Sequence, residues 1–143
     1  MKKKIYYGLA VYDDKEINAV NNVLKNKKLT LIDGPLVKKF EKEVAKLFGK
    51  KYALMVNSGS SANLLALASL KLKRNSEIIT PTLTFSTTVA PIYQLGLVPN
   101  FIDVEINKFI VDVDKIEKNI NKNTKALIIP NLLGNIPNYK RSE

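Results

Sequence analysis

The sequence contains no cysteine, no histidine and no tryptophan, and among its 23 basic residues only Arg74 and Arg141 are arginine. Without cysteine, disulfides and thiolate metal sites are excluded, which agrees with the cytoplasmic location that we expect. Without histidine, the chain itself offers no imidazole base or ligand. No apolar run approaches the roughly 20 residues that a membrane span requires, so we expect no membrane partner.

The net charge of +10 is the one strong bias of the composition. It would suit a nucleic-acid partner, but the lysines are scattered through every segment and accompany many Asn and Ile residues, as a codon bias would produce. No aromatic-rich basic ribbon accompanies them, so we expect no nucleic-acid partner. With 143 residues, 45% hydrophobic and 25% charged, the chain is otherwise typical of a globular domain with a real core.

Helical and strand patterns alternate along the chain. The predicted helices cover residues 13–27, 35–48, 60–72, 86–95 and 112–121, and the predicted strands cover residues 52–56, 77–80, 98–102 and 125–130, with a short extended piece at 109–111. This alternation predicts an α/β fold with a parallel sheet, right-handed crossovers and helices on both faces. We see no internal domain boundary.

The most informative segment is the Ser/Gly-rich turn between an apolar run, Tyr52–Val56, and an Ala/Leu-rich helix. Backbone N–H groups at such a helix start are unpaired and lie at the positive end of the helix dipole, which favours a phosphate or carboxylate. The hydroxyls of Ser58, Ser60 and Ser61 add possible donors, and Gly59 allows close approach. An ordinary turn with a serine N-cap is an equally good interpretation of the spacing alone.

Several segments, in this order along the chain, resemble the DegT/DnrJ/EryC1/StrS sugar aminotransferase family, whose members are fold-type-I enzymes that use pyridoxal 5′-phosphate (PLP). They are Gly34–Gly49 (GPLVKKFEKEVAKLFG), Asn57–Leu65 (NSGSSANLL), Thr80–Thr88 (TPTLTFSTT), Gly96–Val104 (GLVPNFIDV) and Asn131–Asn135 (NLLGN). Together they cover roughly residues 8–140. Because the motifs occur in one order, they are far more specific together than any one of them.

The resemblance implies the three-layer parallel or mixed sheet of the family's large domain, with residues 1–143 as its N-terminal, truncated part and no second domain. It also implies PLP or pyridoxamine 5′-phosphate as cofactor, a nucleotide-linked keto sugar as substrate, and a homodimer. The segments at 60–65, 84–91 and 132–135 look most like the 3-dehydratases of CDP- or GDP-4-keto-6-deoxyhexoses, in deoxysugar and lipopolysaccharide biosynthesis. The alternative is a PLP-dependent sugar aminotransferase of the same family.

By the same resemblance, the cofactor-binding residues are Gly59, Ser60, Ser61, Phe85 and Asn131. Gly59 and Ser60 match the phosphate-contacting positions, whereas Ser61 has capping or packing as its alternative role. Phe85 matches the aromatic that stacks on the cofactor ring, the alternative being a core phenylalanine. Asn131 would bind the ring oxygen or the substrate, and a turn residue is its equally good alternative.

No catalytic residue is assigned within the chain. The family's base, lysine in aminotransferases and histidine in 3-dehydratases, is expected beyond Glu143, as is the aspartate that pairs with the pyridinium nitrogen. Asp103 is therefore interpreted as a strand-end or turn residue, and we expect this chain alone to be inactive. Two other classes stay open: a non-catalytic fragment that retains only anion binding or dimerisation, and a generic α/β nucleotide binder, which the missing GxGxxG fingerprint disfavours.

Overall fold

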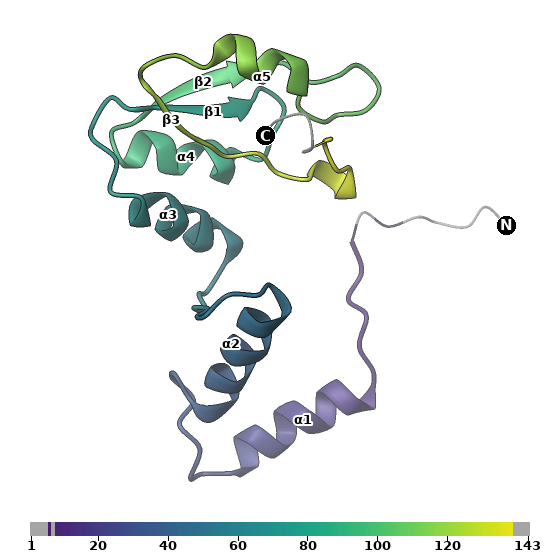
Figure 1. The fold of residues 1–143 in the computed structure, drawn as a ribbon. Helices are drawn as coiled ribbons and strands as arrows, with labels where there is room; N and C mark the ends of the chain where they lie inside the picture. Colours follow the sequence, from purple (N-terminus) through teal and green to yellow (C-terminus); the bar gives the residue numbers. More distant parts are fainter. Residues whose placement is uncertain (1–5, 7, 139–143) are drawn as a thin grey trace, which may run out of the picture. The chain divides into compact units, whose positions relative to one another are not determined.

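The computed structural model describes residue 6 and residues 8–138 of the chain. These residues form two compact units, the first ending at Met55 and the second beginning at Val56, and each is described by itself (Figure 1).

The first helix of the first unit, α1 (Asp14–Lys25), begins at a capping box formed by Asp13 and Glu16. The Asp13 side chain accepts a hydrogen bond from the Lys15 N–H at 2.7 Å, and the Asp13 N–H donates to the Glu16 carboxylate at 2.8 Å. Two otherwise unpaired donors at the helix start are thereby satisfied. The helix ends at Lys25, two residues before the predicted end.

The second helix, α2 (Pro35–Leu47), begins at residue 35 as predicted, with Gly34 as its N-cap and Pro35 at its first position. A Cβ atom at Gly34 would lie 2.2 Å from the Thr30 carbonyl oxygen, so this turn has room only for glycine. Several apolar side chains along α2 are not covered by the described part of its unit. Leu36, Phe40 and Leu47 are each more than half exposed, and so is Phe48, directly after the helix.

The predicted strand at residues 52–56 is wrong, because this segment pairs with no described strand and has no regular secondary structure. Its Met55 N–H donates instead to the Glu41 carboxylate of α2, at 2.7 Å. A strand needs a partner for its backbone N–H and C=O groups, and an apolar run of five residues does not show whether that partner is within reach.

The second unit is a three-layer parallel α/β structure, which confirms the predicted fold class (Figure 1). Its elements are α3 (Gly59–Ser69), β1 (Glu77–Pro81), α4 (Ser86–Gln94), β2 (Val98–Ile102), α5 (Val113–Asn119), β3 (Thr124–Leu127) and the 3-10 turn η1 (Leu132–Gly134). The strand order is β2-β1-β3, and β1 is parallel to both neighbours. The predicted extended piece at 109–111 makes a single antiparallel bridge, between Val104 and Val111.

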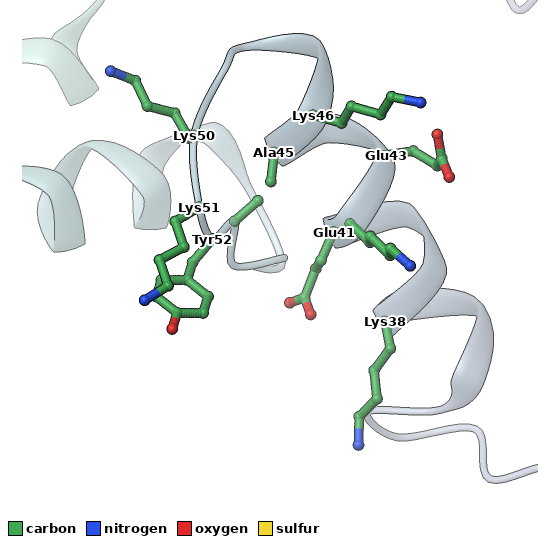
Figure 2. Close-up of a pocket in the computed structure, with 10 residues that line it drawn as sticks. Lys38, Glu41, Glu43, Ala45, Lys46, Lys50, Lys51 and Tyr52 are labelled. Carbon is green, nitrogen blue, oxygen red and sulfur yellow. The ribbon is translucent and has the colours of Figure 1, made fainter.

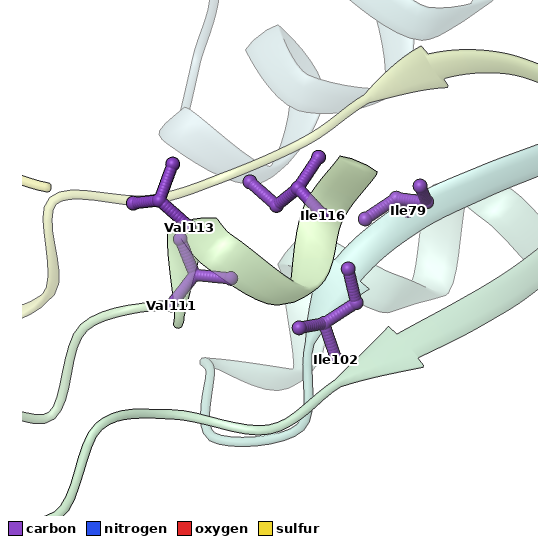
Figure 3. Packing of buried hydrophobic residues seen from close by; sticks show 5 residues of the cluster. All are labelled: Ile79, Ile102, Val111, Val113 and Ile116. Carbon is purple, nitrogen blue, oxygen red and sulfur yellow. The ribbon is translucent and has the colours of Figure 1, made fainter. Parts of the chain in front are cut away.

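Both faces of the central strand β1 are buried, which explains its uninterrupted apolar sequence. Ile79 packs against Ile102 and the side chains of α5 and its approach, Val111, Val113 and Ile116 (Figure 3). The preceding residue, Ile78, points to the opposite face, as neighbours in a strand do, and there it packs with residues that include Leu67 of α3 and Ile92 of α4. The carboxyl ends of the three strands thus lie along one edge of a sheet covered on both sides.

A polar cluster that the sequence did not reveal connects β1 to both neighbouring strands. One carboxylate oxygen of Glu77 accepts hydrogen bonds from the Asn100 amide at 2.9 Å, the Asn121 amide at 2.9 Å and the Thr124 hydroxyl at 2.7 Å. The bonds from Asn100 and Thr124, with a smaller one from Asn121, lower the pKa of Glu77 from its ordinary value, although burial acts in the opposite direction.

Candidate functional site

The start of α3 is fixed by a small network of side chains. Ser58 is the N-cap, and its Oγ accepts a hydrogen bond from the Ser61 N–H at 3.1 Å. The Ser61 hydroxyl donates to Asn57 Oδ1 at 2.7 Å, and the Ser58 hydroxyl lies 3.4 Å from the same oxygen and 3.2 Å from Ser61 Oγ. Two of the three hydroxyls that the sequence offered to a ligand are therefore engaged within the turn, and Ser61 has the geometry of its capping alternative.

The donors that remain at this helix start belong to two residues. The N–H groups of Gly59 and Ser60, and the Ser60 hydroxyl, make no hydrogen bond to any described residue. Both residues are exposed, and a Cβ added to Gly59 would meet nothing within 4 Å. These three donors lie at the positive end of the dipole of an 11-residue helix, and the approach to them is open. Such an arrangement favours binding of a phosphate group.

The loop after β1 presents the predicted aromatic. Phe85 is the N-cap of α4 and its side chain is 69% exposed, so within the described structure it is not a core phenylalanine. Behind it, the hydroxyls of Thr80 and Thr84 are buried and have no hydrogen-bond partner among the described residues. The ring is therefore available for stacking, at the edge of the sheet where α/β proteins bind ligands.

The helices that carry these residues lie side by side. The Asn63 amide of α3 donates to the Thr87 carbonyl of α4 at 3.4 Å. A shallow cavity of about 200 Å³ lies between the two helices, lined by Ser60, Ser61 and Leu64 of α3 and by Thr87, Ala90, Pro91 and Gln94 of α4. The tertiary structure thus brings the helix start at 59–61 beside the helix that begins directly after Phe85.

The two other residues considered from the sequence have local partners. Asn131 is exposed after β3, and its carbonyl accepts the Gly134 N–H at 3.0 Å, as in its turn interpretation. Asp103, at the end of β2, accepts hydrogen bonds from the Val104 N–H at 2.9 Å and the Thr82 hydroxyl at 3.3 Å. These are the contacts of a strand-end residue, as expected for Asp103.

The first unit contains a larger cavity, of about 720 Å³, along α2 and residues 50–53. Lysines dominate its lining, but the ammonium groups of Lys38, Lys46 and Lys50 point in different directions and do not converge on a common point (Figure 2).

Among residues 6 and 8–138, no group of three His, Cys, Asp or Glu side chains is placed to hold a metal ion. No helix formed by these residues is long and apolar enough to cross a membrane.

The second unit therefore has the architecture of parallel α/β proteins, and an exposed helix N-terminus lies beside the helix that follows the carboxyl end of β1, where such folds bind ligands. Residues 11–141 match the model of the DegT/DnrJ/EryC1/StrS aminotransferase family. The chain belongs to this family, which confirms the resemblance seen in the motifs.

Comparison with individual relatives shows how much of their length this chain covers. The chain is 43% identical to the GDP-4-keto-6-deoxy-D-mannose 3-dehydratase of Escherichia coli O55:H7, over 94% of this chain and 36% of that protein. The solved structure of the E. coli GDP-4-keto-6-deoxy-D-mannose-3-dehydratase with bound hydrated PLP superimposes with a TM-score of 0.86 at 41% identity, covering 94% of this chain and 36% of that one.

The chain is also similar to an aminotransferase of known structure. Helicobacter pylori PseC, an aminotransferase involved in the biosynthesis of pseudoaminic acid, matches with a TM-score of 0.87 at 29% identity, over 97% of this chain and 37% of PseC. The chain thus spans little more than a third of the length of these relatives.

Proposed function

We propose that this chain forms the phosphate-binding and ring-stacking part of a PLP- or pyridoxamine-phosphate-dependent enzyme that removes the 3-hydroxyl of a nucleotide-linked 4-keto-6-deoxyhexose. The observation that carries the proposal is the 43% identity to a 3-dehydratase, maintained over 94% of the chain. The bound PLP in the solved E. coli relative, at 41% identity, supports the choice of cofactor.

The residues at the start of α3 fit the phosphate of such a cofactor. The N–H groups of Gly59 and Ser60 and the Ser60 hydroxyl have no partner among the described residues, and a Cβ added to Gly59 would meet nothing within 4 Å. A helix N-terminus favours an anionic ligand such as a phosphate. Ser61 contributes through the turn that its side chain helps to hold. When bound, pyridoxamine phosphate would supply an amine that condenses with the sugar's 4-keto group and an electron sink for removal of the cofactor's own C4′ proton, which allows the 3-hydroxyl to leave.

Phe85 and Asn131 are proposed to hold the rest of the cofactor. The exposed ring of Phe85 would cover one face of the pyridine ring and exclude water from it, an offset stack that contributes about 0.5–1.5 kcal/mol beyond area burial. Asn131, exposed at the carboxyl end of the neighbouring β3, would direct its side chain at the ring oxygen or at the sugar. The catalytic base is expected from a residue beyond Glu143.

An aminotransferase of the same family is the second candidate, and the likeness to PseC favours it. The identity is 29% for that protein against 43% for the dehydratase, so we place the dehydratase first. The two activities differ in the base, histidine or lysine, and in the product formed from one keto sugar.

We also propose a homodimer in the cytoplasm. The apolar side chains that the described residues of the first unit leave exposed support an association of this kind, and Val20, Leu24, Leu36 and Phe40 are all more than half exposed. Sedimentation equilibrium of the purified protein tests the dimer, and a monomer at micromolar concentration would contradict it.

Product analysis tests the activity. The protein expressed from its complete reading frame is incubated with pyridoxamine 5′-phosphate, glutamate and GDP-4-keto-6-deoxy-D-mannose, and the sugar products are identified by mass spectrometry. We expect loss of the 3-hydroxyl; a 4-amino sugar would identify an aminotransferase instead, and no conversion would refute both.

Cofactor binding is measured separately, by calorimetric titration with pyridoxamine 5′-phosphate, because this form does not react with surface lysines. Ser60→Ala should weaken binding about five- to tenfold by removing one donor to a charged group. Ser69→Ala is the matched control, since Ser69 lies at the other end of the same helix and, among the described residues, its hydroxyl bonds only to the Ala66 carbonyl. Equal affinities in the two variants would exclude the proposed phosphate site.

A further inference from the structure

Asn57 is the residue on which the helix-start network converges, although it lies outside α3. Its Oδ1 accepts the Ser61 hydroxyl at 2.7 Å and lies 3.4 Å from the Ser58 hydroxyl. The hydroxyl of Ser61 has a single hydrogen, and this contact directs it away from any ligand at the helix start. Ser58 and Ser61 flank Gly59 and Ser60, so Asn57 holds both ends of the segment that presents the unpaired donors.

We propose that Asn57 is a positioning residue of the phosphate site, and that its side chain must be neutral. This inference rests on the proposed function, and it concerns the segment that orients the donors of that same site. By accepting from Ser61, the Asn57 carboxamide keeps the first turn in the conformation in which the N–H groups of Gly59 and Ser60 meet no acceptor in the described part of the chain.

The requirement for a neutral side chain follows from two opposing effects of charge. An aspartate at residue 57 keeps an acceptor oxygen for Ser61, and a negative charge beside a helix N-terminus stabilises the helix. Helix stability alone would therefore favour aspartate. A phosphate dianion bound at Gly59 and Ser60 would be repelled by that carboxylate, since residue 57 is only two and three positions away along the chain and physiological salt screens charges fully only beyond about 8 Å. Asparagine satisfies the network without this repulsion.

The variant Asn57→Asp separates positioning of a phosphate from a purely structural role. We expect its affinity for pyridoxamine 5′-phosphate to fall about tenfold or more, while its affinity for pyridoxamine, which has no phosphate, changes less than twofold. Its melting temperature should be unchanged or higher. Asn57→Ala, which removes the acceptor without adding charge, should lose about three- to tenfold in affinity for the phosphorylated form.

Asn107→Asp is the charge-matched control, because Asn107 is exposed and lies in the connection between β2 and α5, away from α3 in the sequence. All proteins are made from the complete reading frame and titrated by calorimetry with both ligands. An Asn57→Asp variant that binds the phosphorylated form as the control does would overturn the inference while leaving the proposed cofactor intact. Equal losses for both ligands would also overturn it, since they indicate a structural role. Failure of the unmodified protein to bind either ligand would overturn the proposed function, and the inference with it.

Discussion

Glu77 offers the sharpest test of what holds the sheet together. A single oxygen of its carboxylate accepts from Asn100 in the middle of β2, from Asn121 before β3 and from Thr124 at the start of β3, so one side chain connects β1 to both neighbouring strands. We expect Glu77→Gln to lower the free energy of unfolding by about 1–2 kcal/mol and Glu77→Ala to lower it by about 2–4 kcal/mol.

These magnitudes follow from the three bonds. Hydrogen bonds to a charged group contribute about 1.5–3 kcal/mol each and those between neutral groups about 0.5–1.5 kcal/mol. Glutamine keeps the accepting oxygen and loses the charge, which would cost about 3 kcal/mol over three bonds, reduced to about 1–2 kcal/mol because solvent screens the exposed amide of Asn121. Alanine removes the acceptor altogether, so the half-buried Thr124 hydroxyl loses its acceptor and the Asn100 amide keeps only its bond to the Asn119 carbonyl, at 3.2 Å.

The pH dependence has a definite sign. The pKa of Glu77 is lowered from its ordinary 4.5 by its hydrogen bonds, chiefly those from Asn100 and then Thr124. The unfolded chain therefore binds this proton more readily than the folded chain, and the stabilisation is complete above about pH 4.5 and is lost as the pH falls through the lowered value. The difference in stability between the natural protein and Glu77→Gln should shrink over the same range.

Urea unfolding followed by circular dichroism, at pH 7 and at steps from pH 5 to pH 3, measures both effects. Glu117→Gln is the control, because Glu117 is an exposed carboxylate on α5 of the same unit, with the same change of charge. If Glu77→Gln and Glu117→Gln unfold at the same urea concentration at pH 7, the reasoning about the cluster is refuted.

Two further substitutions test packing, each by the same unfolding assay. Gly34→Ala should destabilise by about 1–3 kcal/mol, because its Cβ would lie 2.2 Å from the Thr30 carbonyl oxygen; Gly8→Ala, where a Cβ meets nothing within 4 Å, is the control, and equal stability of the two would contradict this reason. Thr80→Val should stabilise by about 1–2 kcal/mol by removing a fully buried hydroxyl that has no partner among the described residues. A loss of stability in Thr80→Val would show that this hydroxyl does have a partner in the folded protein.

Much of the molecule follows from local sequence. Two helix starts depend on only a few neighbouring residues: the capping box of Asp13 and Glu16, and the Gly34-Pro35 start of α2. Such local signals can be recognised in the sequence without a structure. The alternation of helical and strand patterns was enough to predict a parallel α/β unit, and the ordered motifs from Gly34 to Asn135 were enough to predict the family. The starts of α3 and α4, at Gly59 and Ser86, lie within one residue of the prediction.

Strand pairing and hydrogen bonds between residues far apart in the chain could not be predicted from the sequence. Residues 52–56 have the composition of a strand, but only pairing makes a strand, and their Met55 N–H bonds to Glu41 instead. Three serines stood at the predicted phosphate site, and only the folded turn shows that Ser58 and Ser61 bond to each other and to Asn57, which leaves Ser60 to a ligand. The Glu77 cluster joins residues up to 47 positions apart. Local patterns therefore determined the elements and the family, whereas the tertiary structure decided which polar groups have partners and which remain open to a ligand, because hydrogen bonds between distant residues exist only after the chain has folded.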